Sequence, residues 1–489
     1  MTGTRDHIRF LLGDEPRELR GIDPTMTVLN YLRQVEGRCG TKEGCAEGDC
    51  GACTVVLAEP SGEGLRYQAV NSCIQFLPTL DGRQLITVED LRAPDGNLHP
   101  VQQAMVETHA SQCGFCTPGF VMSLYALYCS GERPDRPRIN DVLAGNLCRC
   151  TGYGPIIAAA EQACDGKAGD CAAPDGSKLA DRAQSDDRSV ALEHEGRRYF
   201  APTTSDELAA LLLKYPEAVL LAGSTDVGLW VTKQHRVLET VVFLGDIPEL
   251  KRIESGDGHI EIGAMASYTD AMDLLAGHFP DIGEVFRRLG SVQIRNAGTI
   301  GGNIANGSPI GDSPPPLIVL EAEIVLRRGD ERRVLPLEDF FLAYGKQDRQ
   351  PDEFLESIRV PLPQAGDRFR CYKISKRFDQ DISAVCGAFR LRLEGGRVAD
   401  IRIAYGGMAA TPKRATMAEQ ALIGRTWDEA AMQAGKAALC QDFTPLTDMR
   451  ASQDYRMRAA QNLLTKFYLE TSDSTVATRL VGDPELAHV

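Results

Sequence analysis

The chain has 489 residues, of which 43% are hydrophobic and 25% are charged, and its formal net charge at pH 7 is −15. This length allows about three domains at the usual ~100–200 residues each. So acidic a chain lacks the cationic face that nucleic acid requires, and no apolar run approaches the ~20 residues of a membrane span.

The distribution of cysteine is the strongest signal in the composition. Twelve of the 15 cysteines lie in the first 171 residues. The N-terminus carries Arg5, Asp6 and Arg9 and has no uninterrupted apolar stretch, so we do not expect a signal peptide. We therefore expect a cytoplasmic protein, where stable disulfides are uncommon and clustered cysteines indicate a bound metal.

Hydrophobic spacing divides the chain into a multidomain α+β arrangement. The first region predicts short strands with a hairpin over residues 8–19, and the second predicts four helical segments. The last predicts a hairpin at Gly395-Gly396 and helices from about 415 and 452. The predicted regions are 1–85, 86–165, a polar linker over 166–189, then 190–365 and 366–489.

The stretch "KEGCAEGDCGAC" holds the first set of clustered cysteines. Cys45, Cys50 and Cys53 have C-x4-C-x2-C spacing, and Cys73 follows them, which is the plant-type [2Fe–2S] pattern. Glycines at 44, 48 and 51 allow the backbone to wrap closely around an inorganic core and to point N–H groups at sulfur. Zinc is the alternative, but structural zinc prefers two cysteine pairs with short spacing.

A second set combines two cysteine pairs. Cys113 and Cys116 stand in "QCGFCTPGF", Cys148 and Cys150 stand in "NLCRCTGY", and each pair precedes a predicted helix. Helix N-termini direct N–H groups and positive dipole ends at an anionic centre. Alone, this set fits zinc equally well. Beside the first set, it favours a second [2Fe–2S] cluster in a helical bundle.

The remaining cysteines of this half have no metal spacing. Cys129 and Cys164 lie in helical segments with apolar neighbours and are predicted to be core residues, and Cys171 lies in the linker.

Three motifs in fixed order carry a family resemblance. "GCAEGDCGACTV", "CGFCTPG" and "GNLCRCTGY" resemble the iron–sulfur domains of the molybdenum hydroxylases, which include xanthine dehydrogenases, aldehyde oxidases and carbon monoxide dehydrogenases. The resemblance covers residues 1 to about 165. It implies a β-grasp ferredoxin-like domain whose cluster is held by the first cysteine set, and a four-helix domain whose cluster is held by the second.

Two glycine-containing stretches in the second half predict binding of an anionic ligand. "AVLLAGSTDVG" (218–228) predicts a strand, a loop and a helix start. "NAGTIGGNIANGSPIGDSPPPL" (296–317) holds five glycines and four prolines and predicts a rigid loop rather than a helix or central strand. Neither dinucleotide-fold nor P-loop motifs occur. From the residues alone, two ordinary surface turns are an equal alternative.

Both stretches resemble the FAD segments of the molybdenum hydroxylase flavin domain, which has the vanillyl-alcohol-oxidase type of fold and is followed by a C-terminal α+β domain. Leu289 stands where the family commonly has an aromatic, and Tyr344 aligns with an aromatic near the flavin ring on the NAD side. The loop 375–383 corresponds to a segment that affects access of NAD or oxygen. The resemblance implies FAD contacts at Leu220, Leu221, Ala222, Gly223, Ser224, Thr225, Asp226, Val227, Leu289, Thr299, Ile300, Gly301, Gly302, Asn303, Asp312, Leu355 and Lys373.

The order of parts most closely resembles the iron–sulfur/FAD small subunit of the bacterial xanthine dehydrogenases. This implies electron transfer from a molybdenum-cofactor-binding large subunit through two [2Fe–2S] clusters to FAD and NAD⁺, in an α2β2 heterotetramer, with no catalytic acid or base in this chain. Another molybdenum hydroxylase, acting on aldehydes, N-heterocycles or carbon monoxide, is the alternative within the family. A zinc-bound scaffold is the non-enzymatic alternative.

Overall fold

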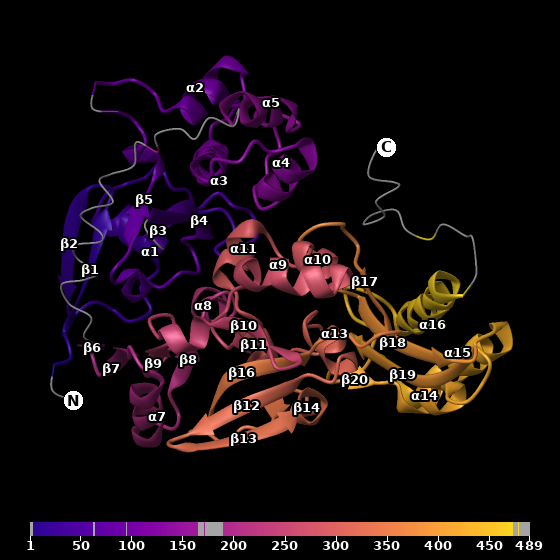
Figure 1. The fold of residues 1–489 in the computed structure, drawn as a ribbon. Helices are drawn as coiled ribbons and strands as arrows, with labels where there is room; N and C mark the ends of the chain where they lie inside the picture. Colours follow the sequence, from indigo (N-terminus) through magenta and orange to yellow (C-terminus); the bar gives the residue numbers. More distant parts are fainter. Residues whose placement is uncertain are drawn as a thin grey trace. The chain divides into compact units, whose positions relative to one another are not determined.

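A computed structural model describes residues 3–61, 64–93, 95–164, 171, 189–472 and 478 (Figure 1). The chain forms two compact units. The first comprises Met1–Glu249 and Gly290–Gly298, and the second comprises Leu250–Leu289 and Thr299–Val489. Of the predicted linker, only Cys171 and residue 189 belong to the described residues.

The first unit begins with a five-stranded sheet in the order β2-β1-β5-β3-β4. β1 pairs with β5 in parallel, and the other pairs are antiparallel. Buried side chains of β1, including Phe10, pack against Val28 and Leu32 of the helical crossing, which confirms the β-grasp prediction. The elements are β1 (His7–Leu12), β2 (Glu15–Arg20), α1 (Val28–Asn30), a π-helix (Tyr31–Val35), β3 (Thr54–Ser61), β4 (Gly64–Asn71), 3-10 helices at Leu77–Leu80 and Val88–Asp90, and β5 (Gln84–Ile86).

Four helices follow, as predicted. They gather around a core that contains Phe120, Leu124, Ile139 and Ile156. All four have proline in the first turn, where the missing N–H removes no helical hydrogen bond. The helices are α2 (Pro100–Glu107), α3 (Thr117–Cys129), α4 (Arg136–Leu143) and α5 (Gly154–Ala163).

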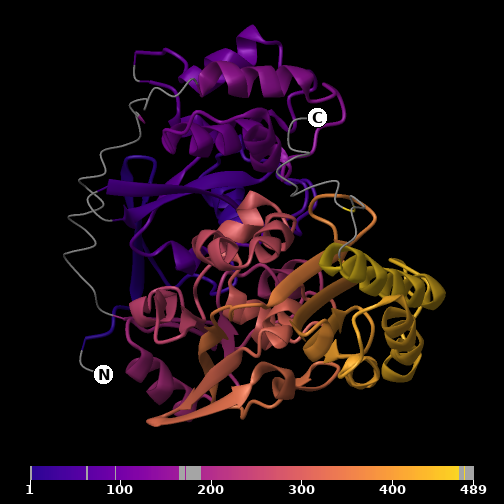
Figure 2. The same cartoon turned by 45° about the vertical axis from the view of Figure 1, so that its right-hand side comes forward.

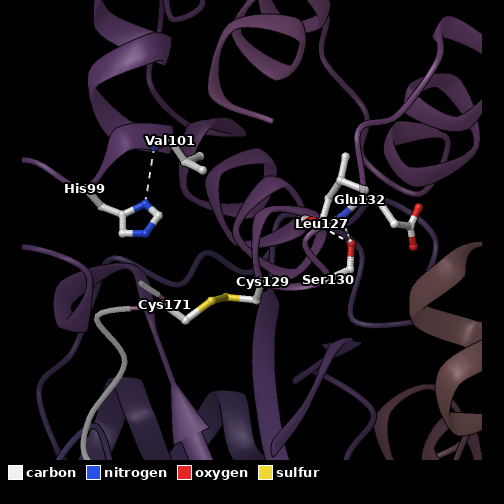
Figure 3. The surroundings of a disulfide bond; sticks show 7 residues. All are labelled: His99, Val101, Leu127, Cys129, Ser130, Glu132 and Cys171. Carbon is white, nitrogen blue, oxygen red and sulfur yellow. Dashed lines mark hydrogen bonds between the residues drawn. A yellow bond between two sulfur atoms is a disulfide. The ribbon is translucent and has the colours of Figure 1, made fainter. Parts of the chain in front are cut away.

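A disulfide joins Cys129, the last residue of α3, to Cys171 (Figure 3). The interpretation of Cys129 as a core thiol is therefore wrong: its neighbours are apolar, but its sulfur is bonded to a cysteine 42 residues later. Residue pairing of this kind cannot be deduced from sequence spacing. Cys164, by contrast, is buried in the helical core as predicted.

The rest of the first unit is a four-stranded sheet in the order β6-β7-β9-β8. Its buried residues Tyr199, Leu221 and Val241 belong to the same hydrophobic cluster as Ile8 and Leu85 of the ferredoxin-like sheet, so the two sheets share one core. The elements are β6 (Val190–His194), β7 (Arg197–Ala201), α7 (Ser205–Lys214), β8 (Val219–Leu221), α8 (Val227–Thr232), β9 (Thr240–Phe243) and α11 (Val292–Ala297).

The second unit contains a five-stranded antiparallel sheet in the order β10-β11-β16-β12-β13. A core that includes Ile262, Phe286, Ile304 and Ile358 lies between this sheet and its helices. The elements are a 3-10 helix at Pro248–Lys251, β10 (Ile253–Gly256), β11 (His259–Gly263), α9 (Tyr268–His278), α10 (Pro280–Arg287), α12 (Ile300–Asn306), α13 (Pro314–Val319), β12 (Glu323–Arg328), β13 (Glu331–Pro336), a 3-10 helix at Leu337–Phe340, β14 (Phe341–Ala343), β15 (Lys346–Gln347) and β16 (Phe354–Pro361).

The expectation that residues 296–317 form a loop without helix is wrong, because α12 lies within them and α13 begins within them. Thr299 caps α12 by accepting a hydrogen bond from the Gly302 N–H at 2.9 Å. Gly307, with φ of +64°, ends that helix, and the proline run then supplies the first turn of α13. Capping outweighed the low helix propensity of glycine and proline.

The C-terminal part confirms the predicted hairpin and both predicted helices. β18 and β19 pair across Gly395-Gly396, and α16 packs on β17 and β18 (Figure 2). A third helix, α15, was not predicted; Asp428 caps it. The elements are β17 (Arg368–Ile374), β18 (Val385–Glu394), β19 (Arg397–Gly406), β20 (Lys413–Arg414), α14 (Thr416–Leu422), α15 (Glu429–Asp442) and α16 (Gln453–Thr471). Among the described residues, none of the helices has the length and apolar character needed to cross a membrane.

We expect Cys129→Ser to destabilise the helical part of the first unit. A disulfide that spans 42 residues restricts the unfolded chain by an amount worth about 4 kcal/mol. The midpoint of urea unfolding, followed by circular dichroism, should fall in the variant and in reductant-treated wild type, while reductant should leave the variant unchanged. Cys440→Ser, which removes an exposed free thiol, is the matched control. An unchanged midpoint in Cys129→Ser would contradict the assignment.

Candidate functional site

The first four cysteines come together at one end of the ferredoxin-like sheet. Cys45, Cys50 and Cys53 stand in the loop before β3, and Cys73 follows β4. Contacts with Cys50 and Cys73 lower the pKa of the Cys45 thiol, and contacts with Cys45 and Cys53 raise the pKa of Cys73. These contacts join all four thiols, from Cys50 through Cys45 and Cys73 to Cys53.

Glycine permits the tight path of this loop. Gly48 and Gly51 have φ of +84° and +69°, a region that side chains rarely adopt. A Cβ on Gly44 would lie 2.7 Å from the Cys50 sulfur. Backbone N–H groups of Glu47 and Cys50 point at the Cys45 sulfur, with N–S distances of 3.5 and 3.4 Å. The loop therefore supplies both room and hydrogen bonds for an anionic sulfur centre.

The second set is held by the N-terminal ends of two helices. Cys116 is the N-cap of α3, and Cys148 and Cys150 precede α5. Burial and the neighbouring Cys148 raise the pKa of Cys116 to about 12, and contact with Cys113 raises the pKa of Cys150. Each member of the C-x2-C pair thus contacts one member of the C-x-C pair.

A local cap fixes the C-x-C turn. The Thr151 N–H points at the Cys148 sulfur at 3.5 Å, and the Cys148 N–H donates to the Tyr153 hydroxyl at 3.0 Å. Tyr153 has φ of +69°, an unusual value for a residue with a side chain.

The two cysteine sets are linked directly through the backbone. The N–H of Leu147, which precedes Cys148, donates to the carbonyl of Cys50 at 3.0 Å. A Cβ on Gly51 would lie 2.2 Å from the carbonyl oxygen of Gly145, so only glycine allows this approach. The ligand loops of both sets are therefore parts of one packed structure.

A buried polar network braces this junction. The Asn146 side chain donates to the Gly51 carbonyl at 3.1 Å and accepts from Ser123 at 2.7 Å. The Gln293 amide nitrogen, from α11, lies 3.0 Å from both Ser123 Oγ and Asn146 Oδ1. Asn146 and Gln293 could not be predicted from the sequence, because no spacing rule marks a polar residue that is distant in the chain from its partners.

The thiols make pairwise contacts in two groups of four, with N–H groups directed at sulfur. Four thiolates and N–H groups that point at sulfur are what a [2Fe–2S] cluster takes from a protein.

The first predicted flavin segment belongs to the first unit. Leu220 and Leu221 end β8, residues 222–226 turn, and Val227 begins α8, as the sequence predicts. A Cβ on Gly223 would lie 1.7 Å from the carbonyl oxygen of Ala297. Ser224 is 3% exposed and has φ of +63°. The turn is therefore a close-packed backbone structure rather than an ordinary surface turn.

The second predicted flavin segment belongs to the second unit, at the start of α12. A Cβ on Gly301 would lie 2.5 Å from the carbonyl oxygen of Ala264, which fixes glycine there. The buried side-chain oxygen of Asn303 has no hydrogen-bond partner among the described residues. A buried acceptor without a partner is costly, and a hydrogen-bond donor on a bound ligand would remove that cost.

Asp312 and Lys373 form a buried ion pair in the second unit. Lys373 Nζ lies 2.5 Å from Asp312 Oδ2, and Ser383 Oγ donates to Asp312 Oδ1 at 2.5 Å. Lys373 also donates to Ser383 at 2.9 Å. The family resemblance points to the two charged residues, but Ser383 was missed because a lone serine in a charged loop carries no signal.

The other predicted residues of the second unit are more scattered. Leu355 is buried in β16, and Leu289 packs at the margin of the same core. Tyr344 is 76% exposed in the turn between β14 and β15. The loop 375–383 is ordered by Asp381, which accepts from the N–H groups of Lys376 and Arg377 at 2.8 and 2.9 Å.

Family models match four consecutive parts of the chain. Residues 11–76 match a 2Fe-2S iron-sulfur cluster binding domain, and residues 87–161 match a [2Fe-2S] binding domain. Residues 192–363 match the FAD binding domain in molybdopterin dehydrogenase, and residues 370–471 match the CO dehydrogenase flavoprotein C-terminal domain.

Relatives extend these matches over nearly the whole chain. Xanthine dehydrogenase of Emericella nidulans is 32% identical over 99% of this chain and 40% of its own length. Aldehyde oxidase 2 of Cavia porcellus is 31% identical over 98% of this chain and 41% of its own length. The chain thus spans about two fifths of these curated relatives.

A solved structure covers the flavin part. A chain of the carbon monoxide dehydrogenase from Hydrogenophaga pseudoflava, in a form that lacks the Mo-pyranopterin moiety of the molybdenum cofactor, matches with a TM-score of 0.53. It is 32% identical, and the match covers 55% of this chain and 94% of that one. With its two [2Fe–2S] domains and its FAD-binding domain, this chain belongs to the molybdenum hydroxylase family, as a chain of the small-subunit type.

Proposed function

We propose that this chain is the electron-transfer subunit of a xanthine dehydrogenase, which takes electrons from a molybdenum-cofactor partner and delivers them to NAD⁺ in the cytoplasm. When bound, the two [2Fe–2S] clusters carry single electrons, and FAD converts them into the two-electron transfer that NAD⁺ requires. The proposed domains are 1–85, 86–165, 190–365 and 366–489, joined by the linker 166–189. The single observation that carries the proposal is the direct contact between the two cysteine ligand loops.

The ligands of the clusters are the eight cysteines of the two sets. Cys45, Cys50, Cys53 and Cys73 would hold the first cluster, and the second set would hold the other. The N–H groups directed at Cys45 and Cys148 stabilise negative charge on sulfur and so raise the potential of a bound cluster. The bond from Leu147 to the Cys50 carbonyl holds the two sets at a fixed separation.

The surface around the second cysteine set supports a protein partner. Cys113 and Cys150 are exposed, and beside them in sequence Phe115 and Leu147 are 47% and 49% exposed. Large apolar side chains around an exposed cofactor ligand are typical of an interface. We propose that the molybdenum-cofactor-binding large subunit covers this surface, in an α2β2 heterotetramer.

The flavin contacts are proposed from the family resemblance and supported locally. The backbone of the 220–227 turn and the helix start at Thr299–Asn303 would bind the pyrophosphate and the neighbouring groups of FAD. Asn303 offers an acceptor that lacks a donor among the described residues. Asp312, Lys373, Leu289 and Leu355 would complete the contacts, and Tyr344 would lie on the NAD side.

A second candidate function is the same role in another molybdenum hydroxylase. The identity to aldehyde oxidase 2 is within one percentage point of that to xanthine dehydrogenase, and the flavin part resembles a carbon monoxide dehydrogenase chain. The electron-transfer residues of this chain would then be the same, and only the partner would differ.

Anaerobic purification with the partner tests the proposal. We expect brown protein with about four irons per chain, because each [2Fe–2S] cluster holds two, together with one FAD and bleaching by either xanthine or NADH. Bleaching by an aldehyde or N-heterocycle instead of xanthine would favour the second candidate. Colourless protein with stoichiometric zinc would overturn both.

We expect Cys148→Ala to remove the second cluster only. Iron should fall by about half, FAD should stay bound, and xanthine-dependent reduction of NAD⁺ should be lost. NADH-dependent reduction of a dye should persist, because it begins at the flavin. Cys440→Ala, which removes an exposed thiol outside both sets, is the matched control. Loss of both activities with FAD retained would contradict the proposed order of electron carriers.

We expect Asp312→Asn to weaken FAD retention and stability. The change leaves the Lys373 ammonium buried without its counter-charge, and breaking a buried pair typically costs about 3–5 kcal/mol. FAD released on gel filtration and the thermal unfolding temperature measure the effect. Asp352→Asn, which breaks a partly exposed ion pair with Arg328 in the same unit, should change neither quantity measurably. Unchanged FAD retention in Asp312→Asn would remove Asp312 from the proposed flavin contacts.

A further inference from the structure

Within the first unit, the segment 224–233 contacts the first cysteine set at two points. This segment runs from the β8–α8 turn to the end of α8. The Ser224 hydroxyl donates to the carbonyl of Ile74, the residue after Cys73, at 2.6 Å. At the other end, the Lys233 ammonium donates to the carbonyl of Cys45 and lies 3.5 Å from the Glu47 carboxylate. The two contacts therefore reach both the Cys45–Cys53 loop and the Cys73 loop, at residues that are 29 positions apart in sequence.

Packing between these two points is equally close. A Cβ on Gly228 would lie 2.6 Å from the Ile74 carbonyl oxygen and 2.8 Å from its Cβ, so the first turn of α8 touches the backbone of the Cys73 loop. Ile74, Cys53 and Cys73 form a small buried cluster against which Leu229 packs. No solvent layer separates α8 from the cysteine loops at these contacts.

The backbone of Ser224 is strained in the conformation that allows its hydroxyl to make the contact with Ile74. Its φ of +63° lies in the left-handed region, which a non-glycine residue occupies only when the surroundings enforce it. Its side chain is buried and its hydroxyl is already directed at Ile74. Glycine would relieve the strain at this position but could not make the bond. The side chain of Ser224 therefore contacts the cysteine loop, and only its backbone is available to the FAD-binding role proposed for the turn 220–227.

We propose that Ser224 and Lys233 are positioning residues that fix the first cluster relative to the flavin-binding turn, and so set the rate of electron transfer between them. This inference rests on the proposed function. Each transfer moves one electron from the reduced first cluster to the flavin, and two transfers with protons from solvent complete its reduction; no covalent bond of the protein forms or breaks. The rate of electron transfer depends steeply on the distance between the cluster and the flavin. Contacts that hold both ligand loops in place therefore affect this rate directly.

The test uses Ser224→Gly in the full chain assembled with its partner. This variant removes the hydrogen bond, relieves the backbone strain and so should fold. Loss of one neutral hydrogen bond raises the equilibrium constant for local opening about fivefold. We therefore expect amide hydrogen exchange around residues 72–76 to be about fivefold faster. Iron content should be unchanged. FAD content and NADH-to-dye activity are measured on the same preparation, and each rate is compared per bound FAD.

The decisive readout is the rate at which NADH, entering at the flavin, reduces the first cluster, followed by rapid-freeze paramagnetic resonance. We expect a severalfold slower rate in Ser224→Gly. Ser205→Ala is the control, because it removes a buried serine hydroxyl of the first unit that has no hydrogen-bond partner among the described residues, and it should transfer electrons at the wild-type rate. A wild-type rate in Ser224→Gly would overturn the role of Ser224.

Lys233→Gln provides a second measurement that does not depend on turnover. Loss of the ammonium beside Cys45 should lower the reduction potential of the first cluster, because less positive charge faces the reduced form. Lys251→Gln, a lysine of the second unit, is the control for loss of one positive charge. An unchanged reduction potential in Lys233→Gln would overturn the proposed role of Lys233. Failure of the wild-type protein to bind iron or FAD would instead overturn the proposed function, so the two outcomes are distinguishable.

Discussion

The backbone-to-backbone contact between the two cysteine loops is the constraint on which the first unit depends. The Gly51 position admits no side chain, because a Cβ would meet the Gly145 carbonyl oxygen at 2.2 Å, and the Leu147 N–H bonds to the Cys50 carbonyl. A second glycine, at 119 in the first turn of α3, would bring a Cβ to the same distance from the Gly51 carbonyl oxygen. These two glycines thus allow the cysteine site next to the sheet and the cysteine site next to the helices to pack directly against each other.

The junction between the two cysteine sites contains a buried polar network. Asn146, Ser123, Thr54 and Gln293 come from four distant parts of the sequence and hydrogen-bond to one another and to the Gly51 carbonyl, while Gln293 Oε1 has no partner among the described residues. Buried amides impose direction, which apolar packing does not. The relative placement of the cysteine loops is therefore specified by hydrogen bonds, while the surrounding helices and sheets supply the burial.

Much of the fold could be predicted from sequence, because local signals were strong. The β1–β2 hairpin turns at Gly13, the four helices begin near proline, and the β18–β19 hairpin turns at paired glycines. The prediction for residues 296–317 was wrong because glycine and proline usually break helices. Here the cap at Thr299 and a first turn that begins with proline permit two short helices. Helix α15 was missed because its apolar stripe is dominated by alanine.

The candidate site was predictable to the extent that its chemistry repeats in sequence. The spacing of the eight cysteines can be recognised in the sequence, and the structure brings them into two groups. Residues whose role depends on a partner far along the chain, such as Ser383 with Asp312, Gln293 with Asn146 and Cys171 with Cys129, gave no signal. Ser224 was named as one member of a ligand-binding turn, but the contact of its hydroxyl with Ile74 needed the structure.

The crossing of the chain between units has a consequence for biosynthesis. Residues 290–298 belong to the first unit, although 40 residues of the second unit, 250–289, precede them. A nascent polypeptide that has left the ribosome only as far as residue 249 lacks Gln293 and therefore the last brace of the cysteine junction. Domains generally fold as they emerge during translation, but here the amino-terminal half must wait for a later segment before its interior is complete.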